Sequence, residues 1–152
     1  MTYTAPVREA ILCHAQEAWP QEACGLLLQP PGDAPALYRP CANLQDSEPV
    51  ADPDGTARGA ETAFHLDGRE VLRAEREGLV LRAIVHSHPE HDAYFSEMDR
   101  KVATLRFPGE PPEPAFPGVS YLVVSVRAGR AVDERWFAWD AAALDFAEAT
   151  AP

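Results

Sequence analysis

A largely apolar run that ends directly in two histidines constrains the fold of this chain more than any other feature. Residues 79–85 are apolar except for one arginine, and His86-Ser87-His88 follows without a break. A short run rich in Leu, Ile and Val is typical of a buried strand. Because strand side chains alternate between the two faces of a sheet, His86 and His88 should project from the same face where the strand ends.

Two imidazoles on one face, with Asp99 a short distance further along the chain, suit a divalent metal ion. Catalytic zinc sites commonly have three protein ligands and a fourth, open position for water. The segment Ser96-Glu97-Met98-Asp99 is also typical of a helix N-terminus, and both interpretations hold if Asp99 faces the histidines from the first turn. His91 is either a further ligand or a solvated loop residue.

Composition limits the classes of protein to which the chain could belong. Its 152 residues, 46% of them apolar and 24% charged, predict a single domain over 1–152. No apolar run approaches membrane-spanning length, and the first residues do not resemble a signal peptide. Cys13, Cys24 and Cys41 lack zinc-finger spacing, which favours reduced thiols and a cytoplasmic location. A net charge of −11 disfavours a nucleic-acid partner.

The remaining pattern mixes helices and strands. Helices are expected over 6–18, 68–77, 96–105 and 141–149, and strands over 24–28, 36–39, 62–66, 79–85, 119–126 and 131–139. Segment 43–60 should be a mobile polar loop, and the proline-rich segment 107–118 a stiff loop without helix or strand. This order predicts an α+β fold, a mixed α/β sandwich around a curved sheet.

Some side chains have expected places within these elements. Asp67 should cap the second helix, with Val71 and Leu72 facing inward. The apolar residues Met98, Val102 and Leu105 of the third helix are available for packing.

A hydrolase also needs a general base, and Glu22 is the best candidate. It stands just ahead of the strand that begins at Cys24, where a carboxylate at the edge of a sheet could reach a cavity. Gly25 would allow close approach of a neighbouring backbone. Cys24 could instead be a nucleophile paired with histidine, although a small buried side chain is the more usual role in a strand.

These residues together resemble the JAMM (MPN+) metalloprotease family, and more narrowly its prokaryotic JAB-like branch. The resemblance rests on Glu22 before Cys24-Gly25-Leu26-Leu27, and on His86-Ser87-His88-Pro89 with Ser96 and Asp99. It extends over roughly residues 20–140. It implies an MPN/JAB-like fold of cytidine-deaminase-like architecture, in which helices flank a curved mixed sheet.

The resemblance also implies a reaction and a partner. Members are zinc peptidases or isopeptidases that act at the Gly-Gly tail of ubiquitin-like or sulfur-carrier proteins. Carried over by position, His86, His88 and Asp99 bind one Zn²⁺, and Glu22 is the general base for the metal-bound water. Ser96 stabilises the tetrahedral intermediate. The role implied for Glu22 agrees with elementary chemistry. Zinc lowers the pKa of bound water to about 7, so a nearby base can take a proton from that water near neutral pH.

Two other classes remain open. A non-catalytic MPN-type scaffold would only bind partners, but such modules commonly lose ligands, and this chain retains the full set. A DNA-repair branch with a similar His-x-His-Pro pattern fits poorly with Glu22 and the net charge of −11. The sequence does not specify the partner protein, the linkage or the oligomeric state. Loops 43–60 and 107–118 could rim a substrate groove or merely connect elements.

Overall fold

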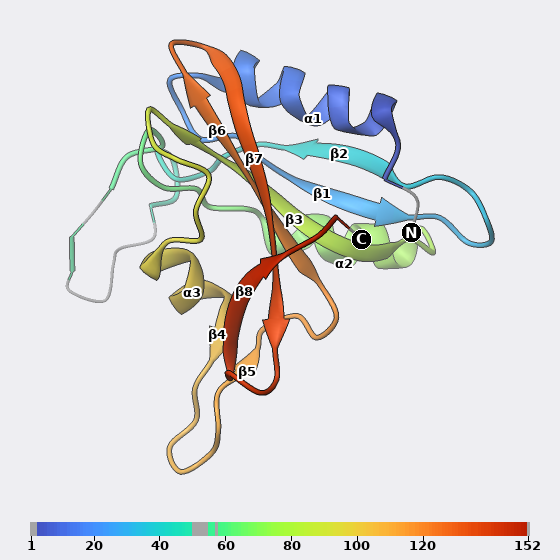
Figure 1. The fold of residues 1–152 in the computed structure, drawn as a ribbon, viewed down its shortest axis with the longest axis vertical. Coiled ribbons are helices and arrows are strands. Elements are labelled where there is room, and N and C mark those ends of the chain that lie inside the picture. Colours follow the sequence, from blue (N-terminus) through green and yellow to red (C-terminus); the bar gives the residue numbers. More distant parts are fainter. Residues whose placement is uncertain (1–2, 50–54, 57, 152) are drawn as a thin grey trace.

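Two long central strands, β3 and β6, run parallel to one another and organise the sheet of the computed structural model, which describes residues 3–49, 55–56 and 58–151 (Figure 1). All other pairs in the six-stranded sheet are antiparallel, in the order β2-β1-β3-β6-β7-β8. The helices are α1 (Ala5–Ala18), α2 (Gly68–Arg76) and α3 (Glu97–Ala103). The strands are β1 (Cys24–Gln29), β2 (Leu37–Cys41), β3 (Val80–Pro89), β4 (Thr104–Leu105), β5 (Glu113–Pro114), β6 (Ser120–Arg127), β7 (Arg130–Asp140) and β8 (Asp145–Ala149). The predicted α+β fold around a mixed sheet is therefore confirmed.

Alternate residues of the central strands build two separate cores. One core joins Leu26, Leu28 and Ile84 to α2, and the other joins Leu27 and Val85 to α1. Each buried aliphatic side chain of this kind contributes roughly 1.5–3 kcal/mol through loss of contact with water. The sheet consequently forms the middle layer between these two cores. The core into which each residue of the central strands packs determines the face of the sheet from which its side chain projects.

Close backbone approach occurs at Gly25, as the sequence predicts. A Cβ atom at this position would lie 2.7 Å from the backbone oxygen of Arg39 and 2.5 Å from the hydroxyl of Tyr38. Any larger residue would therefore displace β2 from β1, and β1 in turn pairs with β3.

Both helices that follow loops begin with the expected caps. The Asp67 side chain accepts a hydrogen bond from the Arg69 N–H at the start of α2. Ser96 and Asp99 form a reciprocal capping box at the start of α3. The inward side chains of α2 are Val71 and Ala74, whereas Leu72 is half exposed, so its predicted inward position is wrong.

The strand expected over 62–66 does not form. Apart from a single bridge between Asn43 and Leu66, this segment is irregular. Two of its backbone groups bond instead to one side chain, because Asn43 donates to the Ala63 carbonyl and accepts from the His65 N–H, while the His65 carbonyl accepts from the Leu44 N–H. An asparagine with this full set of bonds replaces a strand ladder.

The helix expected over 141–149 is also wrong, because Asp145–Ala149 forms strand β8 beside β7. Asp140 accepts bonds from two following N–H groups, as a helix cap would, but Leu144 then adopts a positive φ of 52° and turns the chain back. Phe146 is buried against Phe95 and Tyr121. Tertiary packing of this one ring outweighs the helical propensity of the alanines around it.

The region after α3 differs from expectation as well. The helix ends at Ala103, and the next two residues pair as β4 with β5 inside the proline-rich segment 107–118. Val102 and Leu105 are exposed, so their predicted packing is wrong. The proposed mobile loop 43–60 lies in part outside the described residues. In the described part of the chain, no helix has the length and apolar character needed to cross a membrane.

Candidate metal centre and cavity

The ends of β3 and α3 bring three predicted ligands to one point. The Nε2 atoms of His86 and His88 are 3.2 Å apart, and the Asp99 oxygens lie 3.2 Å from the first and 3.5 Å from the second. These residues form a group that could hold a metal ion, and all three side chains are at most 9% exposed.

The separations match those between ligands that share one ion. Ligands about 2.0–2.2 Å from a tetrahedral zinc are about 3.3–3.6 Å apart, which is the edge length of such a tetrahedron. Two neutral imidazoles that turn acceptor nitrogens toward each other at 3.2 Å also repel, unless a cation or proton lies between them. The donor set therefore fits a divalent metal.

Surrounding groups fix the orientation of both imidazoles. The Nδ1–H of His88 can donate to the Asp92 carbonyl at 3.1 Å, which leaves its Nε2 lone pair for the ion. The ring of His86 stacks on Phe64 at 4.6 Å between centroids. Its Nδ1 is buried without a hydrogen-bond partner among the described residues, so on that side of the ring packing takes the place of a hydrogen bond.

The helix cap positions the third ligand. The Ser96 N–H donates to Asp99 Oδ2 at 2.7 Å, and the Asp99 N–H donates to Ser96 Oγ at 3.1 Å. Burial alone would raise the pKa of Asp99, but the neighbouring histidines and Ser96 hold it well below its usual range. The carboxylate is thus ionised and ready to bind a cation.

The Ser96 side chain belongs both to the helix cap and to the wall of the cavity. Its Oγ accepts from the Asp99 N–H, its side chain also hydrogen-bonds to the Asp99 carboxylate, and the residue lines the cavity. The interpretation of Ser96 as a cap and its interpretation as a donor are therefore geometrically compatible.

Glu22 lies in the same cavity, although it comes from a distant part of the chain. The next residue, Ala23, is held beside β3 by two bonds to Ser87: its N–H donates to Ser87 Oγ at 2.8 Å, and its carbonyl accepts from the Ser87 N–H at 3.0 Å. Asn43 Nδ2 donates to the Glu22 carbonyl at 3.0 Å. The backbone that carries Glu22 is therefore held beside the ligand group, and the carboxyl lines the same cavity.

The surroundings of Glu22 favour a group that can gain and lose a proton. Glu22 is 7% exposed. Burial raises the pKa of its carboxyl to about 8, although the charges of His88 and Arg58 act to lower it. A bound cation would move this pKa back down. A carboxyl whose pKa lies near neutrality is well matched to proton transfer.

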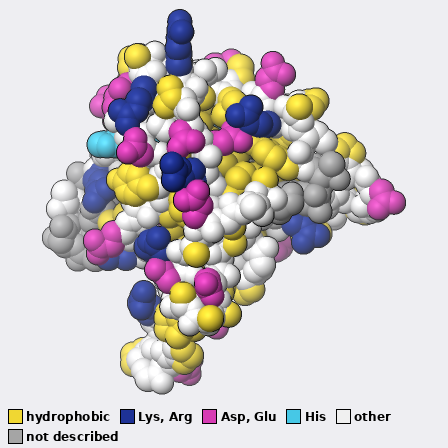
Figure 2. Space-filling view, in the orientation of Figure 1, with side chains coloured by type: hydrophobic (Ala, Val, Ile, Leu, Met, Phe, Trp, Pro, Cys, Tyr) yellow, Lys and Arg dark blue, Asp and Glu magenta, His cyan; other side chains and the backbone are white. Residues whose placement is uncertain are grey.

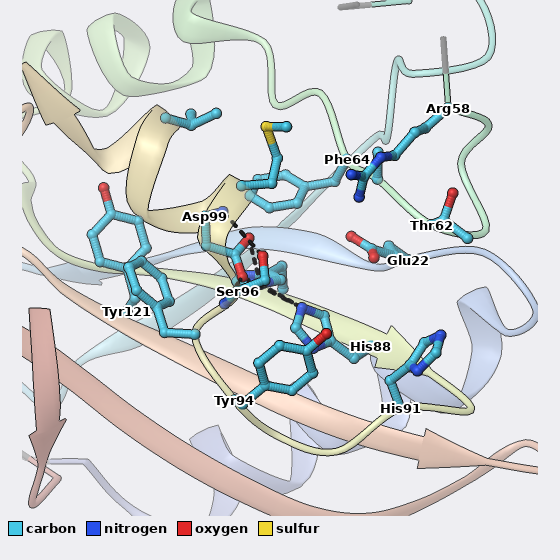
Figure 3. A pocket seen from close by; sticks show the side chains of 15 residues that line it. Glu22, Arg58, Thr62, Phe64, His88, His91, Tyr94, Ser96, Asp99 and Tyr121 are labelled. Atoms are coloured by element: carbon cyan, nitrogen blue, oxygen red, sulfur yellow. Dashed lines mark hydrogen bonds and ion pairs between the residues drawn. The ribbon is translucent and has the colours of Figure 1, made fainter. Parts of the chain in front are cut away.

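The ligand group opens into a cavity of about 400 Å³, in which Figure 3 shows Glu22, Ser96 and His88 around the centre. The other lining residues are Arg58, Thr62, Ala63, Phe64, His86, His91, Tyr94, Phe95, Met98, Asp99, Val102 and Tyr121. His91 lines this cavity but is exposed and lies outside the ligand group. Cys24 is buried in β1, and burial raises the pKa of its thiol to about 12, which disfavours a nucleophilic role.

Several supporting residues carry no motif of their own in the sequence. Asn43, Ser87 and Arg58 act through contacts with backbone or charge that only the folded chain creates. Ser87 lies between the two histidines, so strand alternation predicts that its side chain points to the opposite face of the sheet. No sequence signal pointed to the bonds of Asn43.

Comparisons with known proteins give matches over most of the chain. Residues 4–141 match the family of prokaryotic homologs of the JAB domain. The chain is 31% identical over 128 residues to a CysO-cysteine peptidase from Mycobacterium tuberculosis, covering 81% of this chain and 71% of that protein. It is 31% identical over 144 residues to a desampylase from Haloferax volcanii, covering 90% and 87%.

A third relative matches over a shorter stretch. The tail tip assembly protein K of Escherichia phage N15 is 36% identical over 92 residues, which cover 60% of this chain but only 32% of the phage protein. Among solved structures, a protein from Salinibacter ruber superimposes with a TM-score of 0.64 at 27% identity, covering 99% of this chain and 89% of that one.

Proposed function

Because this chain belongs to the prokaryotic branch of the JAB-domain family, we propose that it is a zinc-dependent peptidase acting at the C-terminal tail of a ubiquitin-like or sulfur-carrier protein. The observation that carries the proposal is the meeting of three ligand atoms within 4.8 Å of one another in a cavity that also contains Glu22. The relative named a CysO-cysteine peptidase supports hydrolysis, and the desampylase supports the same branch.

His86, His88 and Asp99 would hold the zinc ion. When bound there, zinc would lower the pKa of water to about 7 and polarise the scissile carbonyl. Two histidines and one carboxylate are a donor set typical of catalytic rather than structural zinc.

Glu22 would move the proton in this reaction. The carboxylate accepts a proton from the attacking water and delivers it to the departing amine. The C–N bond breaks, the water oxygen joins the acyl carbon, and the amine leaves with the added proton. The position of Glu22, fixed by Ser87 and Asn43, serves both transfers without movement of the chain.

Ser96 would stabilise the developing negative charge on the carbonyl oxygen. The residue lines the cavity, and its hydroxyl would rotate from the Asp99 carboxylate to donate to that oxygen. One donor of this kind typically contributes about 10²–10³ in rate.

The test combines metal analysis with hydrolysis of Gly-Gly-tailed adducts. Zinc-loaded protein should contain one ion per chain and cleave at least one adduct in a panel of tailed ubiquitin-like proteins. The Glu22→Gln variant should keep zinc and lose most activity. Glu110→Gln, the same change at an exposed residue between β4 and β5, should keep both zinc and activity. A protein without metal at His86, His88 and Asp99 would overturn the proposal.

The alternative of a non-catalytic scaffold predicts a different result. Such a protein would bind zinc and a tailed partner but cleave no adduct, and Glu22→Gln would then change neither property. The same panel therefore separates the two functions.

A further inference from the structure

The cavity contains one lysine or arginine side chain among its described lining residues, Arg58. Figure 3 shows this side chain extending toward the Glu22 carboxylate. The charge of Arg58 acts on Glu22, as do the charges of His88 and Asp99. The protein has a net charge of −11, so this cation has a charge opposite to that of the molecule as a whole. On the face shown in Figure 2, acidic and basic side chains are interspersed rather than gathered in one basic patch.

The backbone that presents Arg58 is tied to the backbone that presents Glu22. The Glu22 N–H donates to the Ala60 carbonyl at 2.7 Å. The Ala60 N–H donates in turn to Asp46 at 2.7 Å, and the side chain of the buried Gln45 donates to the Arg58 carbonyl at 2.9 Å. The arginine and the base are therefore held by one set of hydrogen bonds.

The position of Arg58 beside Glu22 determines which atoms of the leaving group it can contact. The departing nitrogen must lie within about 2.6–3.2 Å of the Glu22 carboxylate, because Glu22 is its proton donor in the proposed reaction. In a released amino acid, one carbon separates this nitrogen from the α-carboxylate, so the carboxylate oxygens lie roughly 3–4 Å from the nitrogen. A cation beside Glu22 would meet those oxygens.

A lysine isopeptide offers no such partner. Its nitrogen is followed by a stem of four methylene carbons, and no negative charge lies near the departing atom. A guanidinium is suited to a carboxylate because its planar fork can donate two parallel hydrogen bonds.

We propose that Arg58 is a specificity residue that binds the free α-carboxylate of a single amino acid attached to the tail, and that it thereby favours aminoacyl adducts over lysine isopeptides. This inference rests on the proposed function and names the group that is released. It also assigns Arg58 a role in substrate binding rather than in proton transfer.

Two matched peptides test the proposal by binding. Both end in Gly-Gly-Ala, one with a free carboxylate and one with a carboxamide, and calorimetry measures their affinity for metal-free protein. The wild type should bind the free acid about 10-fold or more tightly than the amide, the size of one charged hydrogen-bonded contact. Arg58→Gln should abolish this preference, and Arg58→Lys should retain part of it. Arg130→Gln, an exposed change of the same charge, should retain all of it.

Hydrolysis of the same adducts by zinc-loaded protein gives the second measurement. Because Arg58 also lowers the pKa of Glu22, its removal can change the hydrolysis of both adducts, so the measured quantity is the ratio of the two KM values. Arg58→Gln should raise KM for the free acid about 10-fold or more relative to KM for the amide. Equal binding of the two peptides by the wild type, or an unchanged preference in Arg58→Gln, would overturn this inference. If the binding preference is present but the wild type cleaves no adduct at all, the proposed peptidase function fails and the assignment of Arg58 stands.

Discussion

Glu22, the proposed base, is also a buried carboxyl whose protonation affects the stability of the fold. Its pKa near 8 lies above the ordinary value of 4.5, so in metal-free protein the folded state keeps a proton that the unfolded chain releases. The sign follows directly: the folded protein is favoured below pH 4.5, and this contribution is lost as the pH rises toward 8. The effect is on the order of 1.4 kcal/mol for each pH unit in that window.

The Glu22→Gln variant isolates this effect because glutamine does not titrate. Without metal, the variant and the wild type should have similar free energies of unfolding near pH 5. At pH 8.5 the variant should be more stable by about 2 kcal/mol or more. Urea unfolding at both pH values in the presence of a chelator measures the difference. A constant difference across this range would mean that Glu22 is not buried in protonated form.

The elements around the site show which parts of the fold the sequence could predict. The apolar run before His86 predicts β3, and the alternation of strand side chains predicts that both imidazoles share a face. Both predictions hold in the structure because alternate residues of β3 pack into two separate cores, which fixes the face of each side chain. Local patterns could not predict β8, since the position of Phe146 depends on Phe95 and Tyr121, which are distant in the chain. Likewise, Glu22 could be suggested as a base, but the bonds through Asn43 and Ser87 that fix it arise only from pairing of distant segments.

The N-caps of two helices give a controlled comparison at the level of elements. Ser96→Ala at α3 and Asp67→Ala at α2 should each lower the free energy of unfolding by about 0.5–2 kcal/mol, because each removes a capping hydrogen bond, and Asp67→Ala also removes an exposed ion pair with Arg69. Only Ser96→Ala should also lower kcat, by about 10²–10³, since only Ser96 faces the cavity.

Chemical unfolding and steady-state kinetics on both variants measure the two effects. Ser96→Thr should preserve cap and hydroxyl together and serve as the rescue. Equal kcat in Ser96→Ala and Asp67→Ala would remove Ser96 from the stabilisation of the oxyanion.

At the scale of the whole molecule, a shared ion would join β3 to α3 and so stabilise the folded state. Free zinc at 100 times its Kd adds about 2.7 kcal/mol, which corresponds to a rise in Tm of roughly 5–10 °C for a domain of this size. Thermal unfolding with zinc and then with excess chelator should show this rise and its reversal. His86→Ala should abolish the rise, whereas His91→Ala should retain it. Loss of the effect in His91→Ala would place that residue among the ligands.

The separation of the proposed base from the proposed metal ligands along the chain has an evolutionary consequence. His86, His88 and Asp99 lie within one short segment, whereas Glu22 belongs to another and meets them through the pairing of β1 with β3 and the bonds between Ala23 and Ser87. A single substitution before β1 could therefore silence turnover while the ion site survives intact. Descendants of such a chain would pass from enzyme to metal-stabilised adaptor in one mutational step, with no intermediate that must unfold.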